Sequence, residues 1–212
     1  MGYHKKGFED GWQMNVELRG DHVIKWPKEK DEIEKKILPY LESKGQKENL
    51  SETRDKILED IENSIRILKN SNIPKECLAN IKFRENKKIE QKQVRTLNEI
   101  FENPDHKGQI KEILEKYVEF KMLLWEYGIH EKTYKIDENF GIDKGEIVLI
   151  DPFEITQDKN KVLRQINKKK WSKKSKYEKF LDEDSINYLI NKIHENWTKE
   201  NLEKLWKRKT HK

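Results

Sequence analysis

The stretch of sequence that decides the fold covers residues 127–156 and reads YGIHEKTYKIDENFGIDKGEIVLIDPFEIT. It contains two short apolar runs, at 139–142 and 146–150, which are separated by the sequence DKG. Apolar runs joined by so short a turn sequence are typical of a β-hairpin. We therefore expect a hairpin here, preceded by a loop.

Two side chains with oxygen atoms flank this hairpin. Asn139 lies at its start, and Asp151 follows its second strand, twelve positions further on. Mg²⁺ prefers oxygen ligands, and the hairpin would hold an amide oxygen and a carboxylate at a fixed separation. A simpler interpretation stays open, because an Asp after an apolar strand is more often a turn residue or helix cap, and Asn139 alone fits a strand start.

The N-terminal half alternates between strand patterns and helix patterns. Residues 12–26 alternate apolar and polar side chains around a central break, which predicts a hairpin. Helical spacing of apolar residues predicts one helix over about 31–43, capped by Asp31, and a second over 51–69, opened by Ser51. Alternation over 78–98 predicts a further hairpin.

The C-terminal half is predicted to be mostly helical. Residues 109–127 are so densely apolar that they predict a helix buried on most of its surface. After the hairpin, apolar spacing predicts helices over Val162 to Ile166, Ile186 to Trp197 and Thr198 to Trp206, the last capped by Thr198. The fold class is therefore α+β.

Composition limits the class of protein. The 212 residues are enough for one compact unit with a sizeable core, and the aromatic residues argue for a folded chain although 40% of residues are charged. Cys77 is the only cysteine, so no internal disulfide can form, and a reducing cytoplasm is the expected location. No stretch approaches the roughly 20 apolar residues of a membrane helix, so no membrane partner is expected.

Three short motifs carry a resemblance to a known family. The sequence ENF at 138–140 and the sequence VLID at 148–151 resemble the end of the catalytic loop and the metal-binding strand end of protein kinases. Upstream, the sequence HVIK at 22–25 resembles the kinase strand whose lysine reaches the nucleotide phosphates. The chain thus resembles a minimal, degenerate protein kinase, mainly over residues 127–156.

The resemblance implies a two-lobed arrangement with a nucleotide cleft between the lobes. Residues 1–98 would form a β-rich N-terminal lobe with two helices, and residues 99–212 a helical C-terminal lobe that includes the short metal-binding hairpin 139–151. The implied cofactors are ATP and Mg²⁺.

The resemblance also implies a role for individual residues. Lys25 would hold the phosphates, and Glu59 would orient Lys25, with Glu62 as the alternative. Asn139 and Asp151 would bind Mg²⁺. Because alternate residues of a strand share a face, Val23 would point into the same cleft as Lys25 and contact the adenine side of the nucleotide.

The chain departs from the kinase pattern where catalysis would occur. The family's catalytic Asp lies five residues before the Asn, a position occupied by Tyr134, which is a poor proton acceptor at neutral pH. Glu131 or Asp137 would replace it only in a loop of different construction, and Gly7 and Gly11 lack the spacing of the kinase phosphate loop. The expected function is therefore nucleotide binding by a pseudokinase or an atypical phosphotransferase.

A basic tract supports an alternative function of another class. From Lys159 to Lys179 ten residues are Lys or Arg and one, Glu178, is acidic. Such a tract could bind nucleic acid or an unidentified protein partner, which would make the chain a non-enzymatic adaptor. The competing interpretation is a solvated face of a lysine-rich protein.

Overall fold

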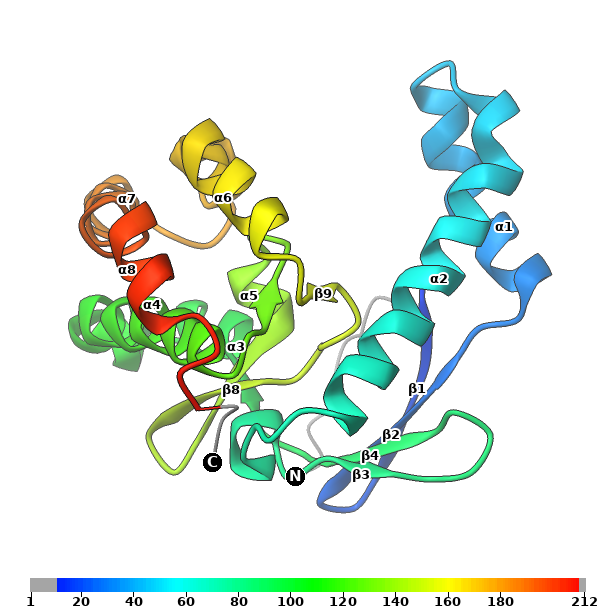
Figure 1. The fold of residues 1–212 in the computed structure, drawn as a ribbon, viewed down its shortest axis with the longest axis horizontal. Coiled ribbons are helices and arrows are strands. Elements are labelled where there is room, and N and C mark those ends of the chain that lie inside the picture. Colours follow the sequence, from blue (N-terminus) through cyan, green and yellow to red (C-terminus); the bar gives the residue numbers. More distant parts are fainter. Residues whose placement is uncertain (1–10, 210–212) are drawn as a thin grey trace.

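The computed structural model describes residues 11–209, which form an α+β fold with three small antiparallel sheets, as predicted (Figure 1). In chain order the helices and strands are β1 (Met14–Arg19), β2 (His22–Pro27), α1 (Lys30–Ser43), α2 (Leu50–Lys69), β3 (Lys82–Phe83), β4 (Ile89–Lys92), β5 (Arg95–Thr96), α3 (Leu97–Phe101), α4 (Ile110–Glu126), β6 (His130–Glu131), α5 (Ile136–Asn139), β7 (Phe140–Asp143), β8 (Glu146–Leu149), β9 (Ile155–Thr156), α6 (Lys159–Lys168), α7 (Glu183–Asn196) and α8 (Lys199–Leu205). Five short 3-10 helices connect them: η1 (Lys47–Asn49), η2 (Lys75–Leu78), η3 (Pro104–Gln109), η4 (Lys170–Ser172) and η5 (Lys174–Lys176).

The N-terminal sheet contains four strands in the order β1-β2-β4-β3. The predicted hairpin 12–26 is present, and its turn uses Gly20 at a φ of 62°, a conformation that glycine adopts at little cost. The second predicted hairpin is also present, with β3 paired to β4. Strand β2 lies between β1 and β4, so both of its edges are hydrogen bonded.

Two helices follow β2, and both begin differently from the sequence prediction. Helix α1 starts one residue early, with Glu29 rather than Asp31 as its N-cap residue. Helix α2 starts at Leu50 rather than Ser51, and its cap residue Asn49 makes no side-chain capping bond. The apolar face of α1 packs on the start of α2 in a small separate cluster, while the second half of α2 joins the main core.

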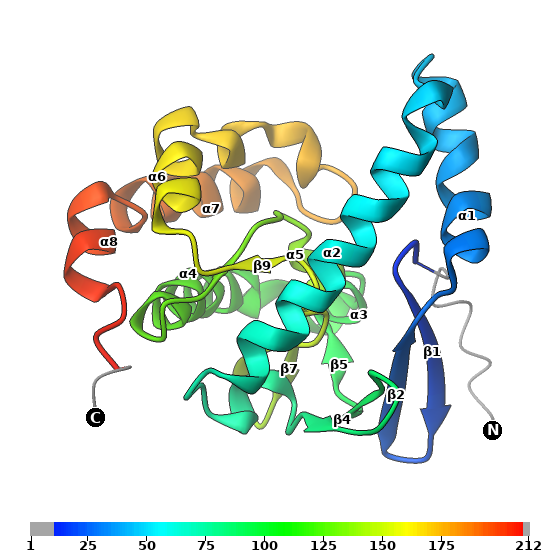
Figure 2. The same ribbon diagram turned by 45° about the vertical axis from the view of Figure 1, so that its right-hand side comes forward.

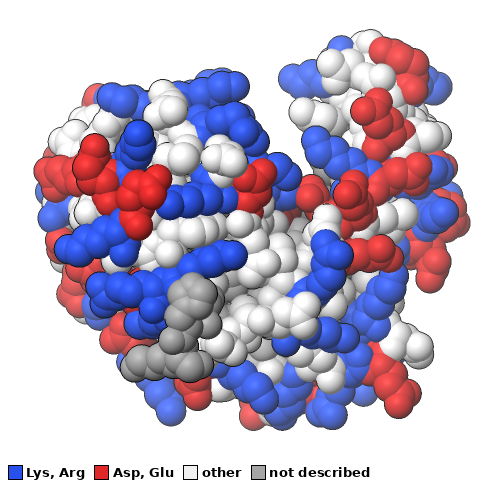
Figure 3. Space-filling model, viewed as in Figure 1, with Lys and Arg blue, Asp and Glu red and all other residues white. Residues whose placement is uncertain are grey.

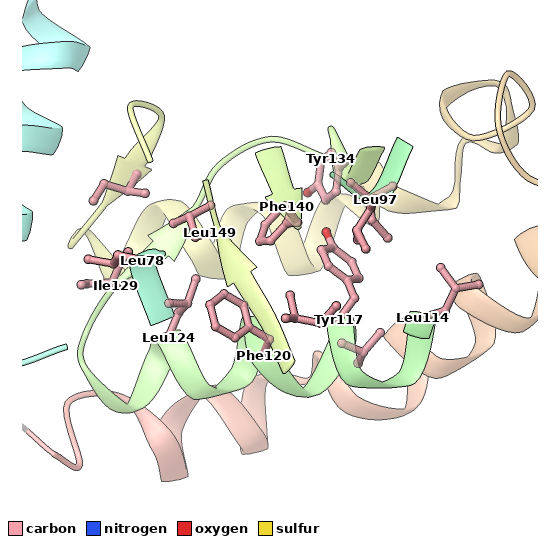
Figure 4. Packing of buried hydrophobic residues seen from close by; sticks show 14 of the residues in the cluster. Leu78, Leu97, Leu114, Tyr117, Phe120, Leu124, Ile129, Tyr134, Phe140 and Leu149 are labelled. Atoms are coloured by element: carbon pink, nitrogen blue, oxygen red, sulfur yellow. The ribbon is translucent and has the colours of Figure 1, made fainter. Parts of the chain in front are cut away.

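The central core surrounds α4, which is buried on most of its surface as predicted. Tyr117 of α4 meets Phe140 of β7 edge to face with ring centroids 5.0 Å apart, and Figure 4 shows this contact among the surrounding leucines. The same apolar cluster extends from Met14 in the first strand to Leu202 in the last helix. The two halves of the chain therefore share one core.

The hairpin predicted from residues 127–156 is formed by β7 and β8. Phe140 pairs with Leu149, and the turn places Lys144 and Gly145 at positive φ, which suits a two-residue hairpin turn. One helical turn, α5, precedes it, and the sequence pattern did not indicate that turn. Gly141 lets β5 approach, because an added Cβ would lie 2.6 Å from the backbone oxygen of Arg95.

Three helices close the C-terminal half, as predicted. Asp158 caps α6, Asp182 caps α7, and Thr198 caps α8 by accepting a hydrogen bond from the backbone of Asn201. Figures 1 and 2 place α6, α7 and α8 on the side of the molecule away from the N-terminal sheet. None of the helices within residues 11–209 has the length and apolarity needed to cross a membrane.

Candidate functional site

Lys25 is a buried cation in the middle of the N-terminal sheet. Its side chain is 8% exposed, and its Nζ atom donates a hydrogen bond of 2.6 Å to the carbonyl oxygen of Ile150. Burial lowers the pKa of Lys25, while the negative charge of Asp151 acts in the opposite direction. Val23 is buried on the same face of β2, as the alternation predicted. Lys25 thus lies at the end of the predicted hairpin, 125 residues away in sequence.

The backbone of Asn139 fixes the other end of this cluster. Its carbonyl oxygen accepts hydrogen bonds from the backbone nitrogens of Ile150 at 2.9 Å and Asp151 at 3.2 Å. These bonds continue the β7–β8 pairing beyond Leu149 and hold Asp151 beside Asn139. Lys25, Asn139 and Asp151 are therefore brought together around Ile150, and we call these three residues the Lys25 cluster.

The carboxylate of Asp151 is partly unsatisfied. Its Oδ1 atom is buried and has no hydrogen-bond partner among residues 11–209. Leaving a buried acceptor unpaired costs about 1–3 kcal/mol or more when it is charged, so a cation or donor bound there would be stabilising. Within the described part of the chain, His, Cys, Asp and Glu form no group of three that could hold a metal by themselves. A metal at Asp151 would need ligands from Asn139 and from the bound molecule.

The side chain of Asn139 is oriented by its neighbours. Its Nδ2 atom donates to Glu131 Oε1 at 3.3 Å and to Thr133 Oγ1 at 3.0 Å. Because a carboxylate only accepts hydrogen bonds, this contact assigns the nitrogen to the Glu131 side and leaves Oδ1 as the acceptor. The amide oxygen is the atom that a hard cation requires.

Glu131 is a structural anchor in this fold rather than an accessible base. Its side chain is fully buried and forms an ion pair of 2.6 Å with Lys121 of α4, which is also fully buried. It also accepts hydrogen bonds from the backbone nitrogen of Thr133 at 2.7 Å, from the Thr133 hydroxyl and from Asn139. With its oxygens used in this way, Glu131 holds the loop that carries Asn139.

Tyr134, at the position of the kinase catalytic Asp, and Asp137, the other candidate proton acceptor, are also enclosed. Tyr134 is 7% exposed, and burial raises the pKa of its hydroxyl far above the neutral range, with the nearby charge of Glu131 acting in the same direction. Asp137 is 3% exposed and pairs with Lys179 at 2.7 Å. Neither side chain is free to take a proton from a bound hydroxyl.

The residues expected on α2 do not reach Lys25. Glu59 is exposed, and Glu62 pairs with Lys87 at 2.5 Å on the surface. The buried polar residue of α2 is Ser64, whose Oγ accepts a hydrogen bond of 3.4 Å from the backbone nitrogen of Ile155 in β9. Gly7 lies outside the described residues.

Sequence reasoning missed three residues that position the site. Lys121 and Gln165 hold the loop before the hairpin, and buried Gln91 of β4 donates to the carbonyl oxygen of Leu78 at 3.0 Å. Lys121 had a visible signal, because a lysine lies in the middle of the most apolar face of residues 109–127. No pattern in the sequence indicated Gln91 or Gln165.

Comparisons with family models, with curated proteins and with solved structures gave no match for this chain.

Proposed function

We propose that this chain binds a nucleotide, with ATP and Mg²⁺ held at the Lys25 cluster. The observation that carries the proposal is the hydrogen bond between Lys25 and Ile150, which puts a buried cation next to a carboxylate with an unpaired oxygen. Residues so far apart in sequence have no local reason to meet. A cation for phosphate oxygens beside oxygen ligands for Mg²⁺ is the chemistry that a metal-bound triphosphate requires.

The order of elements supports the same proposal. Strand β2, which carries Lys25, is followed by the long helix α2, then by the buried helix α4, and then by the hairpin β7–β8, after which Asp151 follows. In the proposed kinase-like organisation, residues 1–98 form one lobe and residues 99–212 the other. The nucleotide would lie between them, with Val23 beside the base.

Binding requires a local exchange of partners. Lys25 now donates to the Ile150 carbonyl, so it must release this acceptor to contact a phosphate. The lost bond is replaced by one to a charged oxygen, which is stronger than a bond to a neutral carbonyl. Bound Mg²⁺ would supply positive charge to the phosphates, while Asp151 Oδ1 and Asn139 Oδ1 hold it in place.

The geometry favours binding over phosphate transfer. Transfer to a hydroxyl is assisted by a base that accepts its proton, and Glu131, Tyr134 and Asp137 are all buried. Glu131 and Asp137 are also paired with lysines. We therefore propose a pseudokinase-like binder in which the nucleotide stabilises the arrangement of the two halves.

Thermal unfolding with and without Mg-ATP tests this proposal. A ligand bound only by the folded state stabilises it, by about 2.7 kcal/mol at a ligand concentration 100 times Kd. We expect Mg-ATP to raise Tm, Asp151→Ala to remove the part that depends on Mg²⁺, and Lys25→Ala to weaken the rest. Glu146→Ala is the matched control, because Glu146 is an exposed acid of the same hairpin. An equal Tm increase in the Asp151→Ala variant would refute the site.

The second candidate function is an adaptor that binds a partner through its basic C-terminal helices. The observation in its favour is that Lys161, Arg164, Lys168 and Lys170 are exposed on one short stretch of the chain, at α6 and η4. An adaptor of this kind would tolerate Asp151→Ala and Lys25→Ala without loss of partner binding. An adaptor of this kind needs no nucleotide site, so Mg-ATP should leave its Tm unchanged, and the melting measurement above separates the two functions.

A further inference from the structure

A groove runs between α2 and α6, with β9 and Lys132 between the two helices. It consists of two adjoining cavities of about 340 and 200 Å³, which share the lining residues Lys132, Thr156 and Lys161. Figure 3 shows the hollow that separates the α6 side of the molecule from the α2 side. None of the residues of the Lys25 cluster lines either cavity. This α2–α6 groove is therefore a separate candidate site.

The lining of the groove is strongly cationic. The basic residues that line it are Arg66 on α2, Lys132 in the loop after β6, and Lys161, Arg164, Lys168 and Lys170 on α6 and just after it. Asp60 is the one acidic residue lining these cavities, and it is already paired with Lys132 at 2.7 Å. Figure 3 shows Lys and Arg gathered on the α6 side, whereas the α2 side carries both basic and acidic residues. The α6 wall would therefore provide most of the attraction for an anion.

Several of these cations lack a carboxylate of their own. Lys161, Lys168 and Lys170 form no ion pair within residues 11–209, and Arg164 approaches Asp158 only at 3.9 Å. Lysines placed close together without acids repel one another, and the charges of Lys170 and Lys173 contribute to lowering the pKa of Lys176 nearby, after its burial. An anionic ligand would relieve this repulsion.

Hydrogen bonds fix the α6 wall before any ligand binds. Gln165 of α6 donates to the Lys132 carbonyl at 2.9 Å and lies 2.8 Å from Nε2 of His130. Burial, together with the charge of Lys121, holds the pKa of His130 well below its usual range, so the ring is neutral. Its Nδ1 atom accepts from Trp125, which leaves the Nε2 proton for Gln165. These bonds tie the α6 wall to the loop that carries Lys132.

We propose that the α2–α6 groove binds a ligand carrying two or more phosphate groups. Two groups are needed because Lys161 and Lys168 are seven residues apart on α6, about 10 Å along the helix axis, which is farther than one phosphate spans. Arg66 and Arg164 offer planar pairs of donors that suit phosphate oxygens, and the neutral side chains of Asn63, Asn70 and Gln157 add polar groups at the α2 end. The ligand is either a small phosphorylated molecule or the phosphate backbone of a nucleic acid strand.

Equilibrium binding of two probes to the full chain tests this proposal. The probes are inorganic tripolyphosphate, measured by calorimetry, and a fluorescent single-stranded oligonucleotide of mixed sequence, measured by anisotropy. The test variant is Lys161→Glu/Lys168→Glu/Lys170→Glu. The matched control is Lys30→Glu/Lys35→Glu/Lys44→Glu, which makes the same charge change at exposed positions on and next to α1. All six lysines are exposed, so both variants should fold, and circular dichroism checks that they do.

We expect at least one probe to bind, with affinity reduced about tenfold or more in the groove variant and little changed in the control. For the oligonucleotide, loss of three phosphate contacts should also reduce the slope of log K against log salt by about two. Binding of tripolyphosphate alone identifies a small-molecule site, and tighter binding of the oligonucleotide identifies a nucleic acid site. The groove variant should keep the Asp151-dependent increase in Tm with Mg-ATP, which separates this site from the Lys25 cluster.

Three outcomes would overturn the proposal. The first is that neither probe binds at moderate salt. The second is that the control variant loses as much affinity as the groove variant, since binding would then follow overall charge. The third is that a polyglutamate peptide binds as tightly as the phosphate probes and with the same sensitivity, because the groove would then recognise acidic protein segments.

Discussion

Removing one partner of the buried ion pair between Lys121 and Glu131 should be strongly destabilising, and Lys121→Met is the substitution that tests this. Both side chains are fully buried, and the Lys121 Nζ atom also donates to the Glu131 carbonyl at 2.6 Å. Methionine has a similar length and leaves the surrounding apolar contacts largely intact. The variant keeps the Glu131 carboxylate buried without its cation, a change that typically costs about 3–5 kcal/mol. The total free energy of unfolding of most single domains is only about 5–15 kcal/mol.

Urea unfolding followed by tryptophan fluorescence measures this loss. The double variant Lys121→Met/Glu131→Gln removes both charges, so it should recover at least half of the lost free energy of unfolding. Lys111→Met changes an exposed lysine of the same helix and should shift the free energy by about 0.5 kcal/mol or less. A loss below about 1 kcal/mol for Lys121→Met would refute the reasoning, because it would show that the pair is hydrated or dispensable.

Two further substitutions test the packing of the hairpin and the electrostatics of a helix cap. Gly141→Ala should lower the free energy of unfolding by about 1–3 kcal/mol, because the new Cβ would lie 2.6 Å from the Arg95 oxygen and 2.8 Å from Val94 Cγ2. The control Gly108→Ala should be tolerated, because its new Cβ would have no atom within 4 Å. Equal Tm values for the two variants would contradict the close approach at Gly141. Asp182→Ala removes the cap of α7 and should cost about 1 kcal/mol at neutral pH. Hydrogen bonds from Ser185 hold the pKa of Asp182 below its usual value, so its contribution is present above the unfolded-state pKa and is lost as pH falls through the folded-state pKa. Melting curves of the variant and the wild type should therefore converge in acid, and a constant difference at all pH values would contradict this assignment.

Elements with strong local patterns were predictable from the sequence. The hairpins were visible because strand alternation and turn residues are properties of neighbouring residues, and α4 was visible from its apolar density. The approach of Lys25 to Asp151 came instead from a family resemblance. The structure places the two residues together, and the nucleotide-binding role of the pair stays a proposal.

Features that depend on tertiary contacts were not predictable. Glu131 reads as a polar loop residue, and only the position of Lys121 on the inner face of α4 shows that its carboxylate is buried. Glu59 is exposed, and which residues of α2 face inward depends on how the helix packs, as at Ser64, which contacts β9. The caps of α1 and α2 shifted by one or two residues, which is the usual uncertainty of helix ends.

The α2–α6 groove illustrates a different limit. Its basic tract was evident in the sequence, but Arg66 and Lys132 come from other segments of the chain. Only the folded chain brings them opposite α6. A solvated face and a binding groove have the same composition, and the difference lies in whether a second wall faces the first.

Labelling with an acyl-phosphate derivative of ATP tests the central claim most directly. In this reagent the terminal phosphate carries an acyl group, which is transferred to the amine of a lysine next to the phosphates, with release of the nucleotide. In the proposed site Lys25 is the lysine next to the phosphates, so its amine is the one placed to take the acyl group. Mass spectrometry after proteolysis should identify Lys25 as the lysine whose labelling is lost when excess Mg-ATP is added, and Asp151→Ala should abolish that protection. Protection confined to Lys161, Lys168 or Lys170, with Lys25 unlabelled, would contradict the account and would place the nucleotide in the α2–α6 groove.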